Sequence, residues 1–458
     1  MKKLLIVLAT TIVLLGCSGT GSETRSTKSK ETTTSTIDPN NPLDCPEDGI
    51  NYGCPTAPID PEPEIDYDAL VKECQSTKFR KPKQVAADGV DSWESPGVIT
   101  TAMDFDSDGN IVVTGLFSDE RDFDITSGHK TVGVDEWIFS FIAKFDRETN
   151  FLWIKCLGVG ELFRWYIGPV VNTDNDGNIY HCDQALSKYS PDGKYLWSAS
   201  GGESTFTCAT NQSGDSVLVG SDITLIDQSG RKKWSLPNRY FYAAAFDEQG
   251  NILVGSDQEL AKFTSTGKEL WSIPFKGRNR EFFSPNGVTE YGDSSQITNQ
   301  VGVRADKDGN VLFTFSLNLK NDFDPTSKVH NLTPGWLQDV AIAKYSPQGK
   351  LLWAHIVQIP KATPTSQRYV EGYDISVMPS GDIVVLGGGW GANVQWAGDQ
   401  LFLAKFSPEG DQLKFMWVNH FDSFIHNMGH HIITNKNGRT YVTSSGEPLP
   451  PFLVSRDL

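Results

Sequence analysis

The sequence predicts an all-β fold built from repeated four-stranded antiparallel sheets, and three observations support this. One hairpin pattern recurs in which an apolar run, a turn with Gly and a second run end on Trp, as in residues 186–197. A second hairpin pattern alternates with it, in which two apolar runs flank a polar turn that contains Gly, as in residues 103–113. The apolar runs are short and bounded by turn residues, which is typical of strands. Two hairpins per repeat supply four strands, here called a, b, c and d in chain order.

The hairpin that ends on Trp forms strands c and d. In five copies the first aligned residue and the Trp lie nine positions apart, and a sixth copy carries three extra residues. The aligned pairs are Lys144 and Trp153, Lys188 and Trp197, Leu225 and Trp234, Lys262 and Trp271, Lys344 and Trp353, and Lys405 and Trp417. A large side chain on the outer strand d fills the gap that widens between sheets arranged around an axis. We therefore interpret these Trp residues as packing residues.

The second hairpin forms strands a and b and has seven copies. Its turn glycines are Gly109, Gly177, Gly214, Gly250, Gly309, Gly381 and Gly438. In residues 106–110 the turn ends in Gly-Asn, two residues that accept the positive φ of a tight turn. Strand b is almost continuously apolar, as in residues 111–113 and 383–386, so both of its faces must be covered. Sheets stacked radially about 10 Å apart provide that cover, which predicts a β-propeller.

Closure of the ring sets the predicted number of four-stranded blades at seven. The chain ends in residues 452–458, which match a strand c, and no residues remain for its strand d. We expect residues 79–87 to supply that strand by pairing with the last blade, because this removes an exposed sheet edge. In the alternative, residues 84–93 form a c–d hairpin of their own. Trp93 fits its spacing, although Pro82 would stand in its strand c.

The N-terminus predicts export and lipid anchoring. Residues 1–3, Met-Lys-Lys, precede an apolar run over residues 4–15, which is too short for a spanning helix and typical of a secretory signal. Residues 14–17, Leu-Leu-Gly-Cys, resemble the bacterial lipobox, and the resemblance implies cleavage before Cys17 and acylation of its sulfur. Ser18 resembles the sorting pattern of outer-membrane lipoproteins in Gram-negative bacteria. The alternative is an ordinary signal peptide with an incidental Cys.

Composition divides the chain into three segments. They are a lipoprotein signal peptide over residues 1–17, a linker over residues 18–77 and the propeller over residues 78–458. Residues 18–38 are mostly Ser, Thr, Gly, Lys and Glu, and residues 39–66 are rich in Pro and Asp. Such compositions bury too little apolar surface to fold, so the linker is expected to hold the propeller away from the membrane.

The seven cysteines suit an exported protein. Cys45 and Cys54 flank a Pro-Glu-Asp-Gly turn and could close a small disulfide loop. The four that remain besides Cys17 are Cys74, Cys156, Cys182 and Cys208. Their pairing does not follow from the sequence. Around Cys74, residues 66–74 are expected to form one or two helical turns.

The charge of the chain limits its partners. Its 458 residues carry a net charge of −17, and 38% of them are hydrophobic, which suits a large core. An acidic surface disfavours nucleic acid and anionic lipid, because neither gains favourable electrostatics from it. The charge is compatible with cations, sugars and basic protein surfaces. We therefore expect contact with the membrane through the lipid anchor only.

The repeats resemble known bacterial propellers. Residues 109–115, together with Asp122-Phe123-Asp124 and the hairpin that ends on Trp153, resemble the bacterial SBBP-type β-propeller repeat, and residues 322–325 repeat part of this pattern. The shorter middle blades resemble the Trp-bearing repeats of quinoprotein-type propellers and of the outer-membrane assembly lipoprotein BamB. The resemblance covers roughly residues 79–458. It implies the fold but little about function, because the matching residues are turn and core residues.

Two acidic pairs are candidate calcium ligands. Asp122 and Asp124, and likewise Asp322 and Asp324, flank a Phe in the connection between strands b and c. Two carboxylates one residue apart can share a cation. The alternative is that they bend the chain while the Phe is buried. We expect no other cofactor.

The candidate ligand face carries the b–c and d–a connections, because these are long on one arc of the ring while the other turns are uniformly tight. The aromatic and charged residues there that no core requires are Phe163, Trp165, Tyr166, Arg278, Arg280, Trp336, Arg368, Tyr369, Tyr373, Trp390 and Trp396. Loops on a rigid scaffold commonly hold recognition residues, and aromatic residues and Arg are frequent anchors. The alternative is that these side chains cover their own loops.

The predicted function is binding rather than catalysis. The sequence contains no Gly-x-Ser-x-Gly, His-Glu-x-x-His or Walker motif, and it lacks the adjacent Cys pair common in quinoprotein dehydrogenases. We expect a monomeric, non-catalytic interaction scaffold in the bacterial cell envelope, at the outer membrane, with an envelope or extracellular protein or a glycan as partner. The alternatives are a BamB-like envelope assembly factor, a sugar-binding propeller and a quinoprotein-like enzyme.

Overall fold

The computed structural model divides by its internal contacts into residues Met1–Ile65 and a compact unit over Asp66–Leu458. The structure describes residues 67–76, 98–118, 121–123, 131–132, 138–159, 168–183, 185–200, 205–275, 283–284, 287–288, 301–335, 338–359, 368–391, 400–418, 431–443 and 452–455. No helix among these residues is long and apolar enough to cross a membrane.

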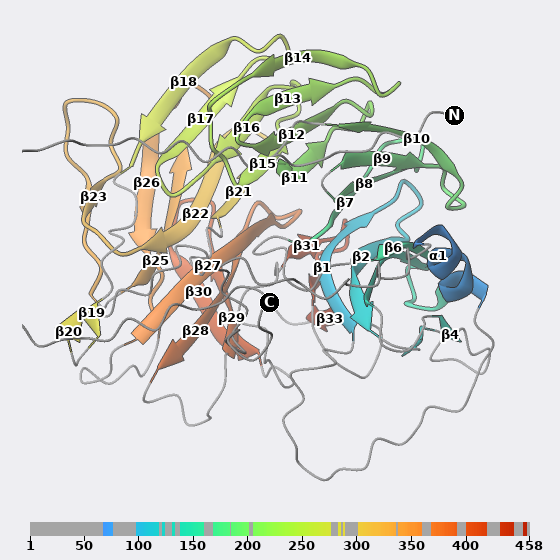
Figure 1. Cartoon of the computed structure of the whole chain (residues 1–458). Helices are drawn as coiled ribbons and strands as arrows, with labels where there is room; N and C mark the ends of the chain where they lie inside the picture. Colours follow the sequence, from blue (N-terminus) through green and yellow to red (C-terminus); the bar gives the residue numbers. More distant parts are fainter. Residues whose placement is uncertain are drawn as a thin grey trace, which may run out of the picture. The chain divides into compact units, whose positions relative to one another are not determined.

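Six four-stranded antiparallel sheets form the blades of a β-propeller (Figure 1). The first blade consists of β1 (Val98–Phe105), β2 (Ile111–Ser118), β5 (Ile138–Phe145) and β6 (Phe151–Val159). The second consists of β7 (Val170–Thr173), β8 (Ile179–Asp183), β9 (Ala185–Tyr189) and β10 (Tyr195–Ser200). The third consists of β11 (Thr205–Thr210), β12 (Ser216–Gly220), β13 (Ile223–Ile226) and β14 (Lys232–Leu236). The fourth blade consists of β15 (Ala243–Phe246), β16 (Ile252–Gly255), β17 (Glu259–Phe263) and β18 (Glu269–Pro274). The fifth consists of β21 (Val301–Ala305), β22 (Val311–Leu317), β25 (Asp339–Tyr345) and β26 (Leu351–Ile356). The sixth consists of β27 (Arg368–Val377), β28 (Ile383–Gly391), β29 (Gln400–Phe406) and β30 (Gln412–Val418). In each blade the strands pair in chain order, which confirms the predicted a–b–c–d hairpins.

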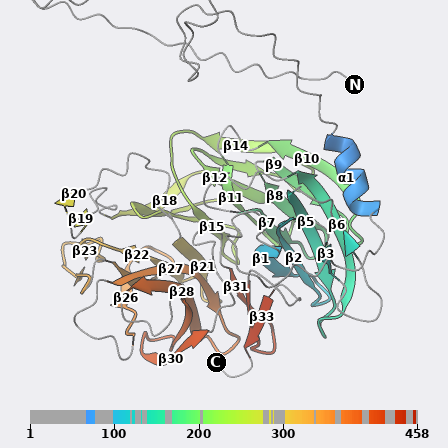
Figure 2. The same ribbon diagram turned by 60° about the horizontal axis from the view of Figure 1, so that its bottom comes forward.

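Among the described residues the seventh sheet has three strands, which corrects the prediction of seven four-stranded blades. It consists of β31 (Ile432–Thr434), β32 (Thr440–Thr443) and β33 (Phe452–Ser455), paired in that order. The predicted partner, residues 79–87, lies outside the described residues. Tyr441 of this sheet packs into the core of the first blade, with its ring 5.2 Å from that of Phe105, so the first and last sheets are in contact (Figure 2).

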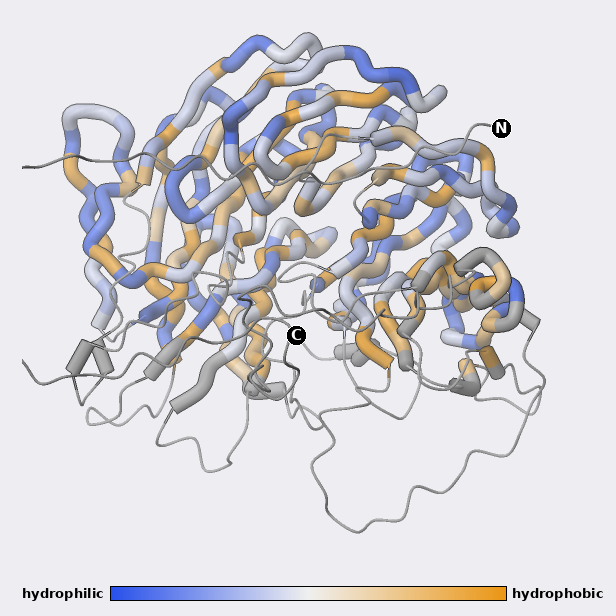
Figure 3. Tube along the Cα trace, in the orientation of Figure 1, coloured by the Kyte–Doolittle hydropathy of each residue, from blue (hydrophilic) through white to orange (hydrophobic). Residues whose placement is uncertain are grey.

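The b strands are covered on both faces, as their sequence predicts. β12, β16, β22 and β32 are buried along their whole length. Hydrophobic residues concentrate along the strands and hydrophilic residues at the turns that connect them (Figure 3). The core therefore runs through the middle of the blades and from each blade to the next.

Five Trp residues of the repeat lie against the c–d turn glycine of the following blade, namely Trp153, Trp197, Trp234, Trp271 and Trp353. The indole nitrogen of Trp271 donates a hydrogen bond of 3.0 Å to the carbonyl oxygen of Pro347, in the c–d turn of the following blade. Gly349 of that turn lies against the same ring, because a Cβ added at Gly349 would stand 2.9 Å from Trp271. Trp234 and Trp353 bond in the same way to the turns that follow them. The Gly and Trp of the repeat are thus contact partners across blades.

The repeated Lys of strand c forms an ion pair inside its own blade. Lys262 Nζ lies 2.8 Å from Asp247 Oδ2, and both side chains are almost fully buried. The equivalent pairs are Lys144 with Asp106, Lys188 with Asp174, Lys344 with Asp306 and Lys405 with Asp382. Since the Asp stands in the a–b turn and the Lys in strand c, each pair fastens the two hairpins of a blade together.

A helix within the predicted linker covers the outer edge of the first blade. Helix α1 (Tyr67–Ser76) is bonded to β6 by a disulfide between Cys74 and Cys156 (Figure 1). The Gln75 side chain donates to the carbonyl oxygen of Ile154 at 2.9 Å and accepts from the Cys156 backbone nitrogen at 2.8 Å. The amide thereby satisfies groups of an edge strand that would otherwise attract another chain. A second disulfide, between Cys182 and Cys208, joins the second and third blades.

Candidate binding cavity

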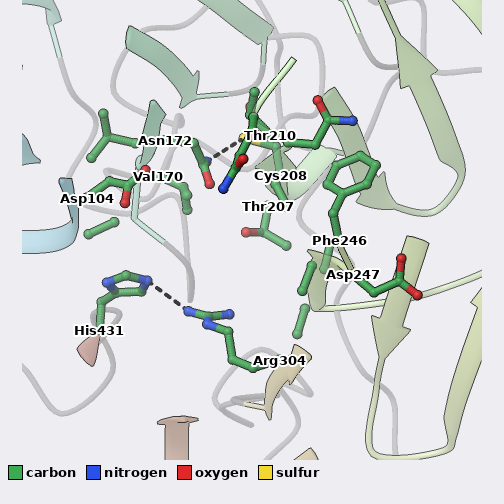
Figure 4. A pocket seen from close by; sticks show the side chains of 18 of the residues that line it. Asp104, Val170, Asn172, Thr207, Cys208, Thr210, Phe246, Asp247, Arg304 and His431 are labelled. Carbon is green, nitrogen blue, oxygen red and sulfur yellow. Dashed lines mark hydrogen bonds between the residues drawn. The ribbon is translucent and has the colours of Figure 1, made fainter. Parts of the chain in front are cut away.

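A cavity of about 1100 Å³ lies where the innermost strands of the sheets meet (Figure 4). Strand a is the inner strand of each blade, so residues of β1, β7, β11, β15, β21 and β27 line it, together with His431 before β31. The three consecutive residues Ala243, Ala244 and Ala245 line it in the fourth blade. Their small side chains leave room in the wall, whereas other blades place polar side chains there.

Arg304 connects three sheets at the wall. Its Nη2 donates to Asp374 Oδ2 at 3.0 Å and to His431 Nε2 at 3.0 Å (Figure 4). Burial lowers the pKa of His431 to about 4; the charge of Arg304 also lowers it, while that of Asp374 opposes the change. The ring is therefore neutral at pH 7, and its Nε2 is free of a proton and accepts from Arg304. The 3.4 Å approach of His431 to Asp374 is consequently not an ion pair at neutral pH.

Two wall carboxylates fasten neighbouring blades through backbone hydrogen bonds. Asp374 accepts from Ile375 N at 2.8 Å and from Ile432 N, in the last sheet, at 3.2 Å. Asp104 accepts from Phe105 N at 2.8 Å and, in the second blade, from the backbone and hydroxyl of Thr173 at 2.8 and 3.1 Å. Burial raises the pKa of Asp104 to about 6, against these hydrogen bonds, which lower it. Both carboxylates thus have defined structural partners.

Neutral amides line the part of the cavity formed by the second, third and fourth blades. The six residues are Asn172, Asn175, Asn211, Gln212, Gln228 and Gln249, here called the amide arc. Apart from Asn172, which is in β7, they stand in turns between strands. Asn175 and Gln212 connect the second and third blades, because Asn175 Nδ2 donates to Gln212 Oε1 at 3.3 Å. The arc is therefore a continuous polar surface across blades.

Of the predicted ligand-face residues, Tyr373 lines this cavity, where its side chain is 9% exposed. Arg368 and Tyr369 belong to β27 and Trp390 to β28. The predicted residues outside the described part are Phe163, Trp165, Tyr166, Arg278, Arg280, Trp336 and Trp396, as well as Cys17, Cys45, Cys54 and Asp124.

Asp104, Asn172 and Arg304 of the cavity wall were not predicted from the sequence as ligand residues. Asp104 and Arg304 each lie five residues before the turn glycine of their blade, and Asn172 holds the same position in the second blade. This position differs from blade to blade, whereas the search for repeats used the residues that agree. Aligning the repeats on the turn glycine and comparing what differs in strand a would have identified these residues.

The described acidic pair belongs to a small hairpin on the fifth blade, in which β23 (Asn321–Asp322) pairs with β24 (Asn331–Leu332). Asp322 accepts from the backbone nitrogens of Asp324 and His330 at 3.1 and 2.8 Å. Asp324 accepts from the backbone and hydroxyl of Thr326, and these bonds lower its pKa. Phe323 between them is buried. The two carboxylates therefore already serve as acceptors within their own loop.

The equivalent pair of the first blade begins in β3 (Arg121–Asp122), which pairs with β4 (Thr131–Val132). Within the part of the chain that the structure describes, no group of three or more His, Cys, Asp or Glu side chains could hold a metal ion.

In the comparisons with known proteins, this chain is similar to solved structures in its fold alone. No protein-family model and no curated protein matches the sequence. A catalytically inactive variant of virginiamycin B lyase from Staphylococcus aureus, crystallised with quinupristin, is 10% identical with a TM-score of 0.38, covering 68% of this chain and 92% of that one. A protein of unknown function from Bacteroides caccae is 12% identical with a TM-score of 0.35, covering 61% and 90%. BamB from Moraxella catarrhalis is 11% identical with a TM-score of 0.34, covering 75% and 80%. At these identities and scores we base no functional argument on them.

Proposed function

We propose that this chain is a cell-envelope lipoprotein whose propeller binds a ligand or partner at its central cavity without catalysing a reaction. The observation that carries the proposal is the cavity itself, about 1100 Å³ in volume and lined from six blades and the last sheet. Pockets for drug-sized ligands measure about 300–1,000 Å³. The cavity therefore suits a ligand of larger size or an extended segment of a partner.

The bonding of the wall favours binding over catalysis. Arg304 is paired with Asp374 and His431, and Asp104 accepts bonds from the backbone of two blades. A catalytic acid or base must reach the reacting atoms of a substrate. These groups instead hold the blades together at the wall, so the rigid wall can present its other polar side chains to a ligand.

The proposed address follows from the N-terminal sequence. Acylation of Cys17 would anchor the chain in the membrane, and Ser18 favours the outer membrane. Residues 18–66 would act as a linker that holds the propeller away from the membrane surface. We also propose that residues 79–87 complete the seventh blade by pairing with β33, the end strand of a three-stranded sheet. An end strand of this kind gains hydrogen bonds from a further strand.

Site-specific photo-crosslinking in living cells tests the binding role. A photoreactive amino acid replaces Gln212 at the cavity or, as a matched control, Gln348 in the c–d turn of the fifth blade, which does not line the cavity. We expect an adduct from position 212 and none from position 348. A protein adduct would indicate an assembly or interaction role, and a small-molecule adduct would indicate a ligand.

Two outcomes contradict the proposal. Equal labelling at both positions, or labelling at position 348 alone, would place binding elsewhere. Conversion of a compound from an envelope extract by the wild-type chain, abolished in Arg304→Ala, would show catalysis at this wall.

A further inference from the structure

We infer that the ligand of the cavity is a neutral oligosaccharide that binds to the amide arc. This inference rests on the proposed binding role and adds the class of ligand. It is carried by the kind of hydrogen-bonding groups that the protein leaves unpaired in the cavity wall. Most of those groups are uncharged amides, and they come from three consecutive blades.

The amide arc keeps unpaired donors and acceptors. An amide side chain offers two N–H donors and one oxygen acceptor. Asn211 Oδ1 accepts from Ser213 and from the Asp215 backbone, while its Nδ2 has no partner among the described residues. Gln228 and Gln249 form no side-chain hydrogen bond to the described protein, and both side chains are exposed. The arc thus offers both donors and acceptors on one surface, which suits the hydroxyls of a sugar.

The buried charged groups of the wall, by contrast, all have partners within the protein, since Asp104 accepts from Phe105 and Thr173. Asp374 is bonded to Arg304, and Asp247 to Lys262 at 2.8 Å. The deep wall therefore offers no uncompensated charge of the kind that selects a small ion. The exposed carboxylates of Asp176 and Glu248 lie beside the arc. They repel anions but accept hydrogen bonds from hydroxyls, so the electrostatics exclude acidic sugars and nucleotides.

An aromatic ring completes the site. Phe246, the last residue of β15, lines the cavity and is half-buried, and Thr210 lies on the neighbouring strand β11 (Figure 4). Ligand sites commonly combine an aromatic surface with a few convergent polar groups. The aliphatic face of a sugar ring fits against Phe246 while its hydroxyls bond to the amides. At about 1100 Å³ the cavity suits several linked rings better than one.

Isothermal titration calorimetry of the full chain in detergent tests this inference. The neutral probes are maltohexaose, cellohexaose and N-acetylchitohexaose, and the charged probes are spermidine and hexagalacturonate. We expect at least one neutral hexasaccharide to bind. The double variant Gln212→Ala/Gln249→Ala should weaken that binding about tenfold, since it removes hydrogen bonds from two blades. Gln348→Ala, an exposed amide outside the cavity, should leave it unchanged.

The outcomes separate the ligand class from the binding role. Suppose that no neutral probe binds, but that spermidine or hexagalacturonate does and that the double variant weakens its binding. The inferred ligand class is then wrong, while the cavity remains a binding site. If a neutral probe binds equally well to the double variant, the amide arc is not its site. If no probe binds, the oligosaccharide inference is overturned, while the photo-crosslinking result decides the binding role separately.

Discussion

Replacing Lys262 by Met should destabilise the propeller by leaving a buried carboxylate without its counterion. The side chains of Lys262 and Asp247 are 2% and 0% exposed, and their charged atoms lie 2.8 Å apart. Met is similar in length and apolar, so the variant creates no large cavity. Removing one partner of a buried ion pair costs about 3–5 kcal/mol. Asp247 keeps hydrogen bonds from Gln249 N and from Asn251, so we expect a loss of about 3 kcal/mol in the free energy of unfolding.

The pH dependence of this loss identifies its cause. In the wild type, burial alone would raise the pKa of Asp247, but the hydrogen bonds from Lys262 and Asn251 lower it below 3.8. The ion pair therefore stabilises the protein above pH 3.8, and this contribution is lost as the pH falls below that value. In Lys262→Met the burial dominates and raises the pKa of Asp247, so acid neutralises the carboxylate and relieves the variant. The difference between variant and wild type should thus be largest at pH 7 and shrink as the pH is lowered.

Urea titrations followed by Trp fluorescence and circular dichroism measure the effect, and coincident transitions justify a two-state free energy. Lys268→Met is the matched control, because Lys268 is exposed in the adjoining c–d turn. Adding Asp247→Asn to Lys262→Met should recover part of the loss, since the buried charge is removed. If Lys262→Met costs no more than the control, or if its cost grows as the pH falls, our account of the buried pair is wrong.

Further predictions concern the repeat, the anchor, the last blade and acid stability. Gly349→Ala should cost about 1–3 kcal/mol in urea titrations, because φ is +80° and the new Cβ would meet Trp271; a neutral effect would contradict the contact. Cys17→Ser should move the protein from the membrane to the soluble fraction or leave it unprocessed, and unchanged fractionation would exclude the anchor. Deleting residues 79–87 should lower the melting temperature and favour oligomers in light scattering, whereas a monomer with unchanged melting would exclude the pairing. Burial lowers the pKa of His181 to about 3 in the folded chain, so the histidine takes up a proton only on unfolding between pH 7 and 5. The free energy of unfolding should therefore fall by about 2 kcal/mol over that range. His181→Gln should reduce this pH dependence, and an unchanged dependence would refute the assignment.

The hairpins could be predicted because their signals are local. All seven a–b turn glycines have positive φ, as the turn chemistry requires. The sequence shows that the Gly and the Trp both recur, but it does not show that Gly349 contacts Trp271, because that contact lies between two blades. Helical turns near Cys74 were predicted, but the placement of helix α1 on β6 and the two described disulfides depend on contacts between distant segments, because 82 residues separate Cys74 from Cys156. No local pattern specifies which cysteines meet.

Apart from Tyr373, the candidate site was not predicted, because the repeat has two kinds of position. The Lys–Asp pair and the Trp–Gly contact recur, since every blade must fasten its hairpins and pack on its neighbour. The position five residues before the turn glycine has no contact that every blade requires. It is Asp104 in the first blade, Ala245 in the fourth and Arg304 in the fifth, although all three belong to inner strands that line the same cavity. Substitutions there alter the wall while the Lys–Asp pair and the Trp–Gly contact of each blade remain. Positions at which the repeats carry the same residue therefore identify the scaffold. Positions at which the residue differs from repeat to repeat identify where a binding site can form.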